Sequence, residues 1–457
     1  MLLPREFLLQ ECRNVQELLR DALRYEYGPA GSRAFFDECS SRLNTIMDDS
    51  LALRDQDTTE IAFYAQQLSH LSQLVAQIER SHIGEFPWAF GECLKTAAEK
   101  LLTEPSLARA GQIKDAGHPL LFIMAEGGLS AFEARRDTAL PKLCNRRVFT
   151  IVVPRSLKNH VLLHAVLGHE VCHSAIWTEK VGNRVNIATK PLGVIEPLRS
   201  VKKLKTWAED HYPNLGSVPD YQADDIRRAW IRELKCDLFG LVFMGPAYLA
   251  AVRTMLGLSD PTGAHRDAGH PPHVWRYQML EYAYQALEWD KPLPTSVSKP
   301  VREAQRKFHD ALFTYDRQSM ATDEVIPKKE VAISTRKLRK LLDNHGGFDY
   351  RPPKAEVLET LIKDIQHLRP PIGQTVSNDD ITFARAEFRQ VLHAGWLSYH
   401  ADVSKDWQED EKKNGFTIIN RLCEQAIIQE RAIMLTRGPR TVKDPKRRKK
   451  VSENARA

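Results

Sequence analysis

Two histidines and a glutamate stand close together in the chain, as His169-Glu170-x-x-His173. In a helix, residues four apart lie about one turn apart on the same face, so both imidazoles can reach one metal ion. Glu170 would then lie beside that ion, where a carboxylate can take a proton from a metal-activated water. The preceding run 162–168 is mainly apolar and suits a buried helix. The alternative is an ordinary buried helix whose histidines bond to the backbone.

A pair of carboxylates follows further along the chain, as Glu233-x-x-x-Asp237, within a helix predicted over 223–256. Catalytic zinc typically keeps three protein ligands and an open position, so Glu233 can be the third ligand. Asp237, one turn on, can accept the remaining N–H of a ligating imidazole and fix its tautomer. A solvated acidic pair is the alternative, but the apolar run 239–244 indicates that the helix enters a core, where a carboxylate needs a metal or a partner.

A third cluster, His270-Pro271-Pro272-x-x-x-Arg276, opens another predicted helix, because proline is well tolerated at a helix start. His270 can stabilise an oxyanion or ligate the metal. Arg276 can pair with a carboxylate or hold the charge of a transition state. A proline-led turn with one buried salt bridge explains the same residues without any chemistry.

The elements that must position these side chains are mainly helices. Apolar residues at three-and-four spacing predict helices over 15–25 and 61–78. Two short apolar runs bounded by helix breakers, 120–124 and 148–153, predict strands, and either strand can bind a peptide by strand addition. The segment 175–221, with one short helix near 201–210, is expected to form a rim or lid over a cleft, or a plain connection. Further helices are predicted at 301–315, 336–342, 355–368, 381–400 and 416–435.

Taken together, the three clusters resemble the gluzincin metallopeptidases, and most closely the HtpX-like and CaaX-prenyl-type protease family. The resemblance covers residues 145–290, about a third of the chain. It implies Zn²⁺ as the cofactor and a zincin-like catalytic core. It also implies that His169, His173 and Glu233 bind the zinc and that Glu170 is the general base. Asp237 would then lie behind the ligands, and His270 and Arg276 beside the metal.

The chain departs from that family in two ways. No transmembrane helices flank the expected core, which argues against a membrane-embedded substrate. Cys172 stands inside the first cluster, where the family usually has a small residue, and we interpret it as a packing residue because it points off the ligand face. The seven cysteines are scattered and include no C-x-x-C pair, so neither a disulfide framework nor a cysteine-type zinc site is indicated.

Composition sets the remaining bounds. A hydrophobic content of 42% and a charged content of 27% are ordinary for a globular protein. The formal net charge is +6, but residues 437–457 carry nine Lys or Arg and two Asp or Glu, a net +7, so the rest of the chain carries −1. Such basic ends are usually solvated and disordered, and weak contact with nucleic-acid phosphates is the sharper alternative. We expect a soluble, cytoplasmic protein without a membrane span.

The sequence therefore predicts an α+β, mainly α-helical protein. We expect a helical N-terminal region over 1–112, a zincin-like metallopeptidase domain with a small β-sheet over 113–290, a helical C-terminal region over 291–436 and a basic tail over 437–457. The predicted activity is zinc-dependent hydrolysis of peptide bonds in a protein or peptide substrate. Two alternatives stay open: a nucleic-acid-associated protein with a protease-like core, and a helical interaction scaffold with a vestigial metal site.

Overall fold

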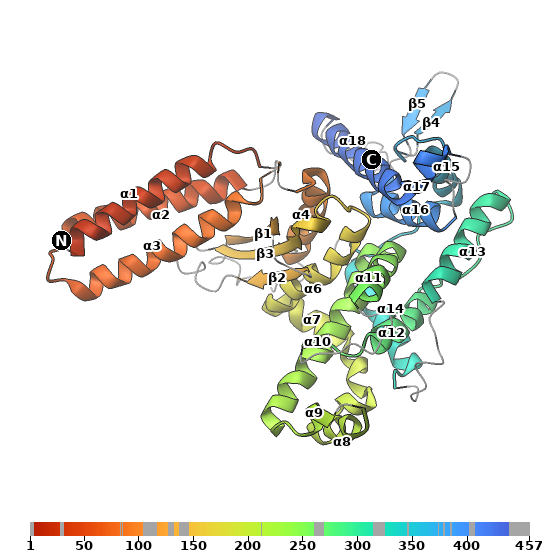
Figure 1. Cartoon of the computed structure of the whole chain (residues 1–457), viewed down its shortest axis with the longest axis horizontal. Coiled ribbons are helices and arrows are strands. Elements are labelled where there is room, and N and C mark those ends of the chain that lie inside the picture. Colours follow the sequence, from red (N-terminus) through yellow and green to blue (C-terminus); the bar gives the residue numbers. More distant parts are fainter. Residues whose placement is uncertain are drawn as a thin grey trace, which may run out of the picture.

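The computed structural model describes most of the chain, in the ranges 4–27, 32–82, 84, 86–103, 117–126, 132–136, 146–211, 213–259, 269–313, 325–344, 347–372, 374–377, 380–383, 386–401 and 407–437. Within these ranges the protein is mainly helical, with a small three-stranded sheet and a separate hairpin (Figure 1). No helix in them combines the length and apolar character needed to cross a bilayer. The basic tail beyond Arg437 lies outside the described residues, so its contact with nucleic acid stays a prediction.

The N-terminal residues form three long helices that project from the body as an arm: α1 (Pro4–Ala22), α2 (Ser32–Ala52) and α3 (Thr58–Glu79) (Figure 1). The spacing that predicted a helix over 61–78 corresponds to the buried face of α3. The arm has its own hydrophobic core, which joins the body through Phe122 and Val148 of the sheet.

The sheet has the strand order β1-β3-β2. Strands β1 (Gly117–Glu126) and β3 (Arg146–Pro154) are parallel and contain the two predicted apolar runs. The third strand, β2 (Glu133–Arg136), pairs antiparallel with β3 and was not predicted, because its sequence is mostly polar. Since β3 is paired on both sides, it cannot accept an added peptide strand. Among the described residues, β1 and β2 each have a strand neighbour on one side only, so both are edge strands.

Two helices carry most of the predicted site, α6 (Leu167–Trp177) and α10 (Asp220–Met244). They pack against each other where both have glycine. A Cβ added to Gly168 would lie 3.3 Å from the Cα of Gly240 and 2.5 Å from Cγ of Met244. This close approach brings the His169 face of α6 next to the carboxylates of α10. The buried second half of α10 then ends at Gly245, whose φ of 76° suits glycine.

The segment expected as a rim or connection is more helical than predicted. It contains α7 (Glu179–Ala188), α8 (Val201–His211) and α9 (Pro213–Gly216), and α8 and α9 lie beside the first turns of α10 at one end of the body (Figure 1). The helix predicted near 201–210 is α8. Beyond α10 come α11 (Pro246–Ser259) and α12 (His273–Ala286), which complete the surroundings of the site.

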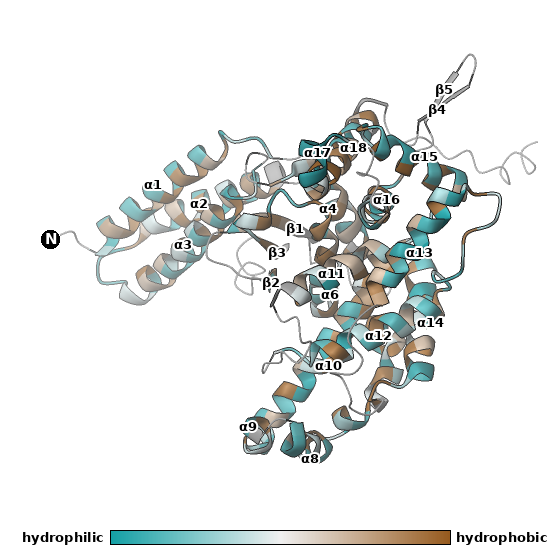
Figure 2. Ribbon diagram, turned by 45° about the vertical axis from the view of Figure 1, so that its right-hand side comes forward, coloured by the Kyte–Doolittle hydropathy of each residue, from teal (hydrophilic) through white to brown (hydrophobic). Residues whose placement is uncertain are grey.

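The C-terminal residues form further helices and a hairpin: α13 (Lys299–Phe313), α14 (Lys328–Asn344), α15 (Ala355–Gln366), β4 (Gln374–Ser377), β5 (Asp380–Phe383), α16 (Phe388–His400), α17 (Glu409–Lys413) and α18 (Gly415–Arg437). Their buried side chains belong to the same hydrophobic core as α6 and α10. Asn420 accepts a hydrogen bond from the backbone N–H of Leu162 at 3.0 Å, and Trp396 donates to the Leu162 carbonyl at 3.2 Å. In Figure 2 the sheet and α4 (Trp88–Thr103) are mainly apolar, whereas α13 and α17 are mainly hydrophilic.

Candidate metal centre

Three potential ligand groups from α6 and α10 converge on one point. Nε2 of His169 lies 3.2 Å from Nε2 of His173 and 3.0 Å from Oε2 of Glu233. Nε2 of His173 lies 3.4 Å from Oε1 of Glu233. The i, i+4 spacing within α6 places the two imidazoles together, and the packing of α10 adds the carboxylate. The structure therefore brings together the three residues that the sequence predicts as metal ligands.

The hydrogen bond of the other His169 nitrogen, Nδ1, shows which protonation state the contact between Nε2 and Glu233 requires. Nδ1 of His169 lies 2.9 Å from Oδ1 of the buried Asp237, so it carries the proton and donates to that carboxylate. Nε2 of a neutral His169 then presents a lone pair toward the Glu233 carboxylate, and two lone pairs at 3.0 Å repel each other. Something positive, either a second proton on His169 or a bound cation, must lie between them.

The charges around His169 favour such a positive group. Burial disfavours the imidazolium form, but the charge of Glu233 and the hydrogen bond to Asp237 outweigh burial and raise the pKa of His169 well above its ordinary value. Burial also opposes ionisation of Glu233, yet the charge of His169 lowers the pKa of Glu233 to about 2. Burial and the neighbouring His169 lower the pKa of His173 to about 4, so His173 is neutral and offers a lone pair.

The donor set and its spacing fit zinc. Zinc bound to nitrogen or oxygen at about 2.0–2.1 Å in a tetrahedron separates its ligand atoms by about 3.3–3.4 Å. The three separations of 3.2, 3.0 and 3.4 Å between His169, His173 and Glu233 are close to that value. Two neutral imidazoles and one carboxylate, with a carboxylate behind one imidazole, are also the donor chemistry typical of catalytic zinc.

Asp237 accepts hydrogen bonds from three side chains on the side of His169 that faces away from Glu233. Arg276 of α12 donates to it twice, from Nε to Oδ2 and from Nη2 to Oδ1, both at 2.7 Å. Tyr248 of α11 donates its hydroxyl to Oδ1 at 2.7 Å. Burial raises the pKa of a carboxyl group, but the Arg276 charge reverses that effect and holds the pKa of Asp237 well below its usual range. Of the two roles predicted for Arg276, the structure shows the pairing with a carboxylate.

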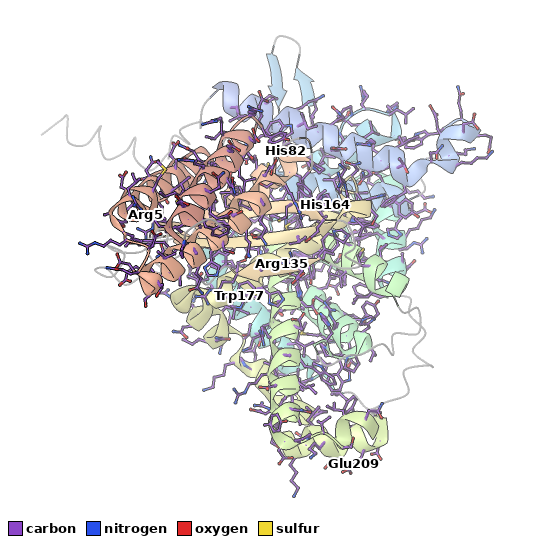
Figure 3. All side chains as sticks on the ribbon, turned by 60° about the vertical axis from the view of Figure 1, so that its left-hand side comes forward. Arg5, His82, Arg135, His164, Trp177 and Glu209 are labelled. Atoms are coloured by element: carbon purple, nitrogen blue, oxygen red, sulfur yellow. The ribbon has the colours of Figure 1, made fainter. Side chains whose placement is uncertain are left out.

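Glu170 is buried on α6 next to His169. Burial raises the pKa of Glu170 to about 7, although the nearby His169 acts in the opposite direction. The backbone N–H of Ala134, on the edge strand β2, hydrogen bonds to the Glu170 carboxylate. Glu170 is thus a buried carboxyl group whose pKa is raised toward neutral pH, and it lies against β2, one of the two edge strands of the sheet. Figure 3 labels Arg135, on β2, and Trp177, at the end of α6, near each other.

His270 lies at the mouth of the centre, just before α12. Its side chain is 48% exposed, and its Nε2 is 3.8 Å from Oε2 of Glu233. It is therefore close to the Glu233 carboxylate and open to solvent, in contrast to the buried His169. The sequence left open whether His270 or Arg276 faces the reacting group, and only His270 of the two has an exposed side chain.

Two residues of the centre were not predicted. Tyr248 has no signal in the sequence, because it reaches Asp237 only through the reversal of the chain at Gly245. Sγ of Cys236 lies 3.5 Å from Nδ1 of His173, and His169, His173 and Cys236 form a second group of potential metal donors within 4.8 Å of one another. Burial, reinforced by Cys172, raises the pKa of Cys236 well above its ordinary value, so Cys236 is a neutral thiol. The predicted packing residue Cys172 is fully buried and hydrogen bonds with Cys236.

Comparisons with protein-family models, with curated proteins and with solved structures find no match to this chain. The resemblance to gluzincin peptidases therefore depends on the three residue clusters alone. The geometry and charges of the centre are accordingly the basis for assigning an activity.

Proposed function

We propose that the protein is a zinc-dependent metallopeptidase with a zincin-like core. The observation that carries the proposal is the convergence of His169, His173 and Glu233 on one point, with the proton of His169 fixed on the opposite nitrogen by Asp237. This arrangement presents three lone pairs to a single cation. Without a metal, the same contacts require a second proton on His169, shared with the Glu233 carboxylate.

The residues of the chain divide the work of hydrolysis. A bound zinc would supply a Lewis acid that makes water acidic and polarises a carbonyl. Glu170 accepts the proton of the attacking water and passes it to the leaving amine, for which a pKa near neutral pH is suited. His270, with its exposed ring beside the ligand carboxylate, donates to the oxyanion that develops on the substrate. Arg276, paired twice with Asp237, holds that carboxylate in place behind His169.

The edge strand β2 is the element that we propose holds the substrate. It contacts α6, and the N–H of Ala134 points to Glu170 rather than to β3. A peptide added along this edge would run next to the base and to the ligand set. This assignment differs from the sequence prediction, in which β1 or β3 was the substrate strand. Strand β3 is paired on both sides, and β1, the other edge strand, packs mainly on α4 and α3, whereas β2 packs on α6.

The test combines metal analysis with cleavage. Purified full-length protein should hold about one zinc per chain, and Glu170→Gln should keep that zinc because Glu170 is not one of the three ligands. Zinc-loaded wild type should cut a library of proteome-derived peptides, and Glu170→Gln should leave it uncut. The matched control is Glu303→Gln, which makes the same chemical change on the exposed face of α13 and should cleave like wild type.

Two results would contradict the proposal. Equal cleavage by wild type and Glu170→Gln would remove Glu170 as the base. If wild-type protein binds no zinc, His169 must instead carry a second proton, and its positively charged ring would lie between the carboxylates of Glu233 and Asp237. The centre would then be a buried ion-pair network of a helical scaffold, which is the vestigial-site alternative.

A further inference from the structure

An imidazole that ligates a metal through Nε2 must carry its proton on Nδ1, and that N–H needs an acceptor. For His169 the acceptor is Asp237, a carboxylate. For His173 the atom in contact with Nδ1 is Sγ of Cys236, at 3.5 Å. The two histidines of the centre therefore have acceptors of very different strength, since a thiol sulfur is a weak acceptor and a carboxylate a strong one.

Cys236 is placed behind His173 and not on its metal-facing side. Nε2 of His173 faces Nε2 of His169 and Oε1 of Glu233, whereas Sγ contacts Nδ1. The N–H or lone-pair directions of Nδ1 and Nε2 diverge in the plane of the imidazole ring. An ion shared by His169, His173 and Glu233 through the Nε2 atoms consequently lies across the ring from the sulfur. The ligand atoms of His169, His173 and Cys236 also lie within 4.8 Å of one another and could hold a metal, but the contact of Sγ with His173 is at Nδ1, the nitrogen that does not face Glu233.

The helix α10 explains why a cysteine occupies this place. Glu233, Cys236 and Asp237 lie three and four residues apart, so all three are on the face of α10 that packs on α6. Glu233 reaches the Nε2 side of both histidines, Asp237 reaches Nδ1 of His169, and Cys236 reaches Nδ1 of His173. One turn of α10 thus contacts both nitrogens of both imidazoles.

We propose that Cys236 is a positioning residue, which accepts the Nδ1 hydrogen of His173 and so fixes the tautomer and ring orientation in which His173 binds zinc. The inference rests on the proposed function, because it assumes that the converging Nε2 atoms hold a metal. Cys172 supports it from behind through its hydrogen bond with the Cys236 thiol. A carboxylate at this position would add a further buried negative charge next to Glu233 and Asp237, whereas a neutral thiol adds none.

The primary test is the zinc affinity of full-length variants, measured by competition with a chromophoric chelator. Removing the partner of a ligating histidine typically costs 10–100-fold in affinity, and for a weak acceptor we expect Cys236→Ala to cost about tenfold. Cys236→Ser restores an acceptor and should recover most of that loss. The two variants differ by one oxygen, and serine is the less favourable of the two to bury, so better binding by the serine variant does not come from packing.

Cobalt substitution separates positioning from ligation. A cysteine bound to Co²⁺ gives an intense near-ultraviolet charge-transfer band, and wild type loaded with Co²⁺ should lack it. A band that is present in wild type and lost in Cys236→Ser would show that the sulfur is a ligand and would overturn the assignment. Cys423→Ala is the matched control, since it removes a fully buried thiol whose Sγ bonds to the Val391 carbonyl and not to His173, and it should bind zinc like wild type.

The possible failures are distinguishable. Wild-type protein that binds no zinc contradicts the proposed function and this inference together. Zinc-binding protein in which Glu170→Gln abolishes cleavage, but Cys236→Ala binds zinc as tightly as wild type, contradicts the role of Cys236 alone. Equal weakening by Cys236→Ser and Cys236→Ala also contradicts it, because the acceptor oxygen would then have no effect.

Discussion

Replacing Asp237 by alanine tests the hub of the centre. In the folded protein Asp237 is fully buried and accepts hydrogen bonds from the Arg276 guanidinium, the His169 ring and the Tyr248 hydroxyl. Its loss leaves the guanidinium of Arg276, itself only 7% exposed, as a buried charge without its counter-ion. Breaking a buried pair from one side typically costs about 3–5 kcal/mol. That is a large part of the roughly 5–15 kcal/mol that holds a domain folded.

The double variant Asp237→Ala/Arg276→Met separates the two roles of the carboxylate. Methionine removes the unpaired charge, and replacing both members of a buried pair by apolar groups is often neutral or stabilising. We therefore expect the double variant to regain most of the stability. It should not regain zinc affinity, because Nδ1 of His169 still lacks its acceptor, which typically costs 10–100-fold.

The assay is chemical denaturation of the two variants and the wild type, all as zinc-free protein, followed by chelator competition for zinc. Recovery of both stability and zinc affinity in the double variant would refute the reasoning, since Asp237 would then act only as the counter-ion of Arg276. A loss below about 1 kcal/mol in the single variant would also refute it, because exposed pairs give that little and a buried pair does not.

Three further results are expected. Zinc binding near pH 6 should release about two protons, one from His169 and one from Glu170, whose pKa is about 7. Calorimetry in buffers of different ionisation enthalpy should show that the number of released protons falls toward one above pH 8, where Glu170 is already ionised. Burial lowers the pKa of His164 to about 4, so between pH 6.5 and 4 the imidazole binds a proton in the unfolded chain but not in the folded protein, and the free energy of unfolding decreases as the pH is lowered. His164→Phe should remove roughly 3 kcal/mol of this decrease, measured by chemical denaturation at pH 7 and pH 4. Gly240→Ala should lower both the melting temperature and zinc affinity, because its Cβ would lie 2.4 Å from the ring of Tyr248, and wild-type values for both would contradict a tight contact between Gly240 and that ring.

The parts of the centre that follow from local spacing were predictable from the sequence. His169 and His173 are one turn apart in α6, and Glu233 and Asp237 are one turn apart in α10, so each pair faces one way whatever the rest of the fold does. The roles of these residues as zinc ligands or supports remain proposals. The sequence could predict that each pair shares a face, while the meeting of the two faces depends on the close packing of α6 on α10.

The parts that depend on distant contacts were not predictable in the same way. Strand β2 has a polar sequence, and it is a strand because β3 offers it a pairing edge. The C-terminal helices reach the segment just before α6 through Asn420 and Trp396, which bond to Leu162 from more than 230 positions away. The sequence shows Cys236 between Glu233 and Asp237, but the contact of its sulfur with Nδ1 of His173 depends on the orientation of that ring against α10 and could not be predicted.

The number of buried charges argues that an ion bound at this centre would be divalent. Glu170, Glu233, Asp237 and Arg276 are all buried, and three carboxylates face one guanidinium. Buried charge is costly unless it is balanced. A proton on His169 together with a neutral Glu170 balances the centre, and a divalent cation with both groups deprotonated balances it equally well. A monovalent cation leaves one negative charge in excess. Exchange of two protons for one divalent cation also leaves Glu170 ionised, which is the form that a general base requires.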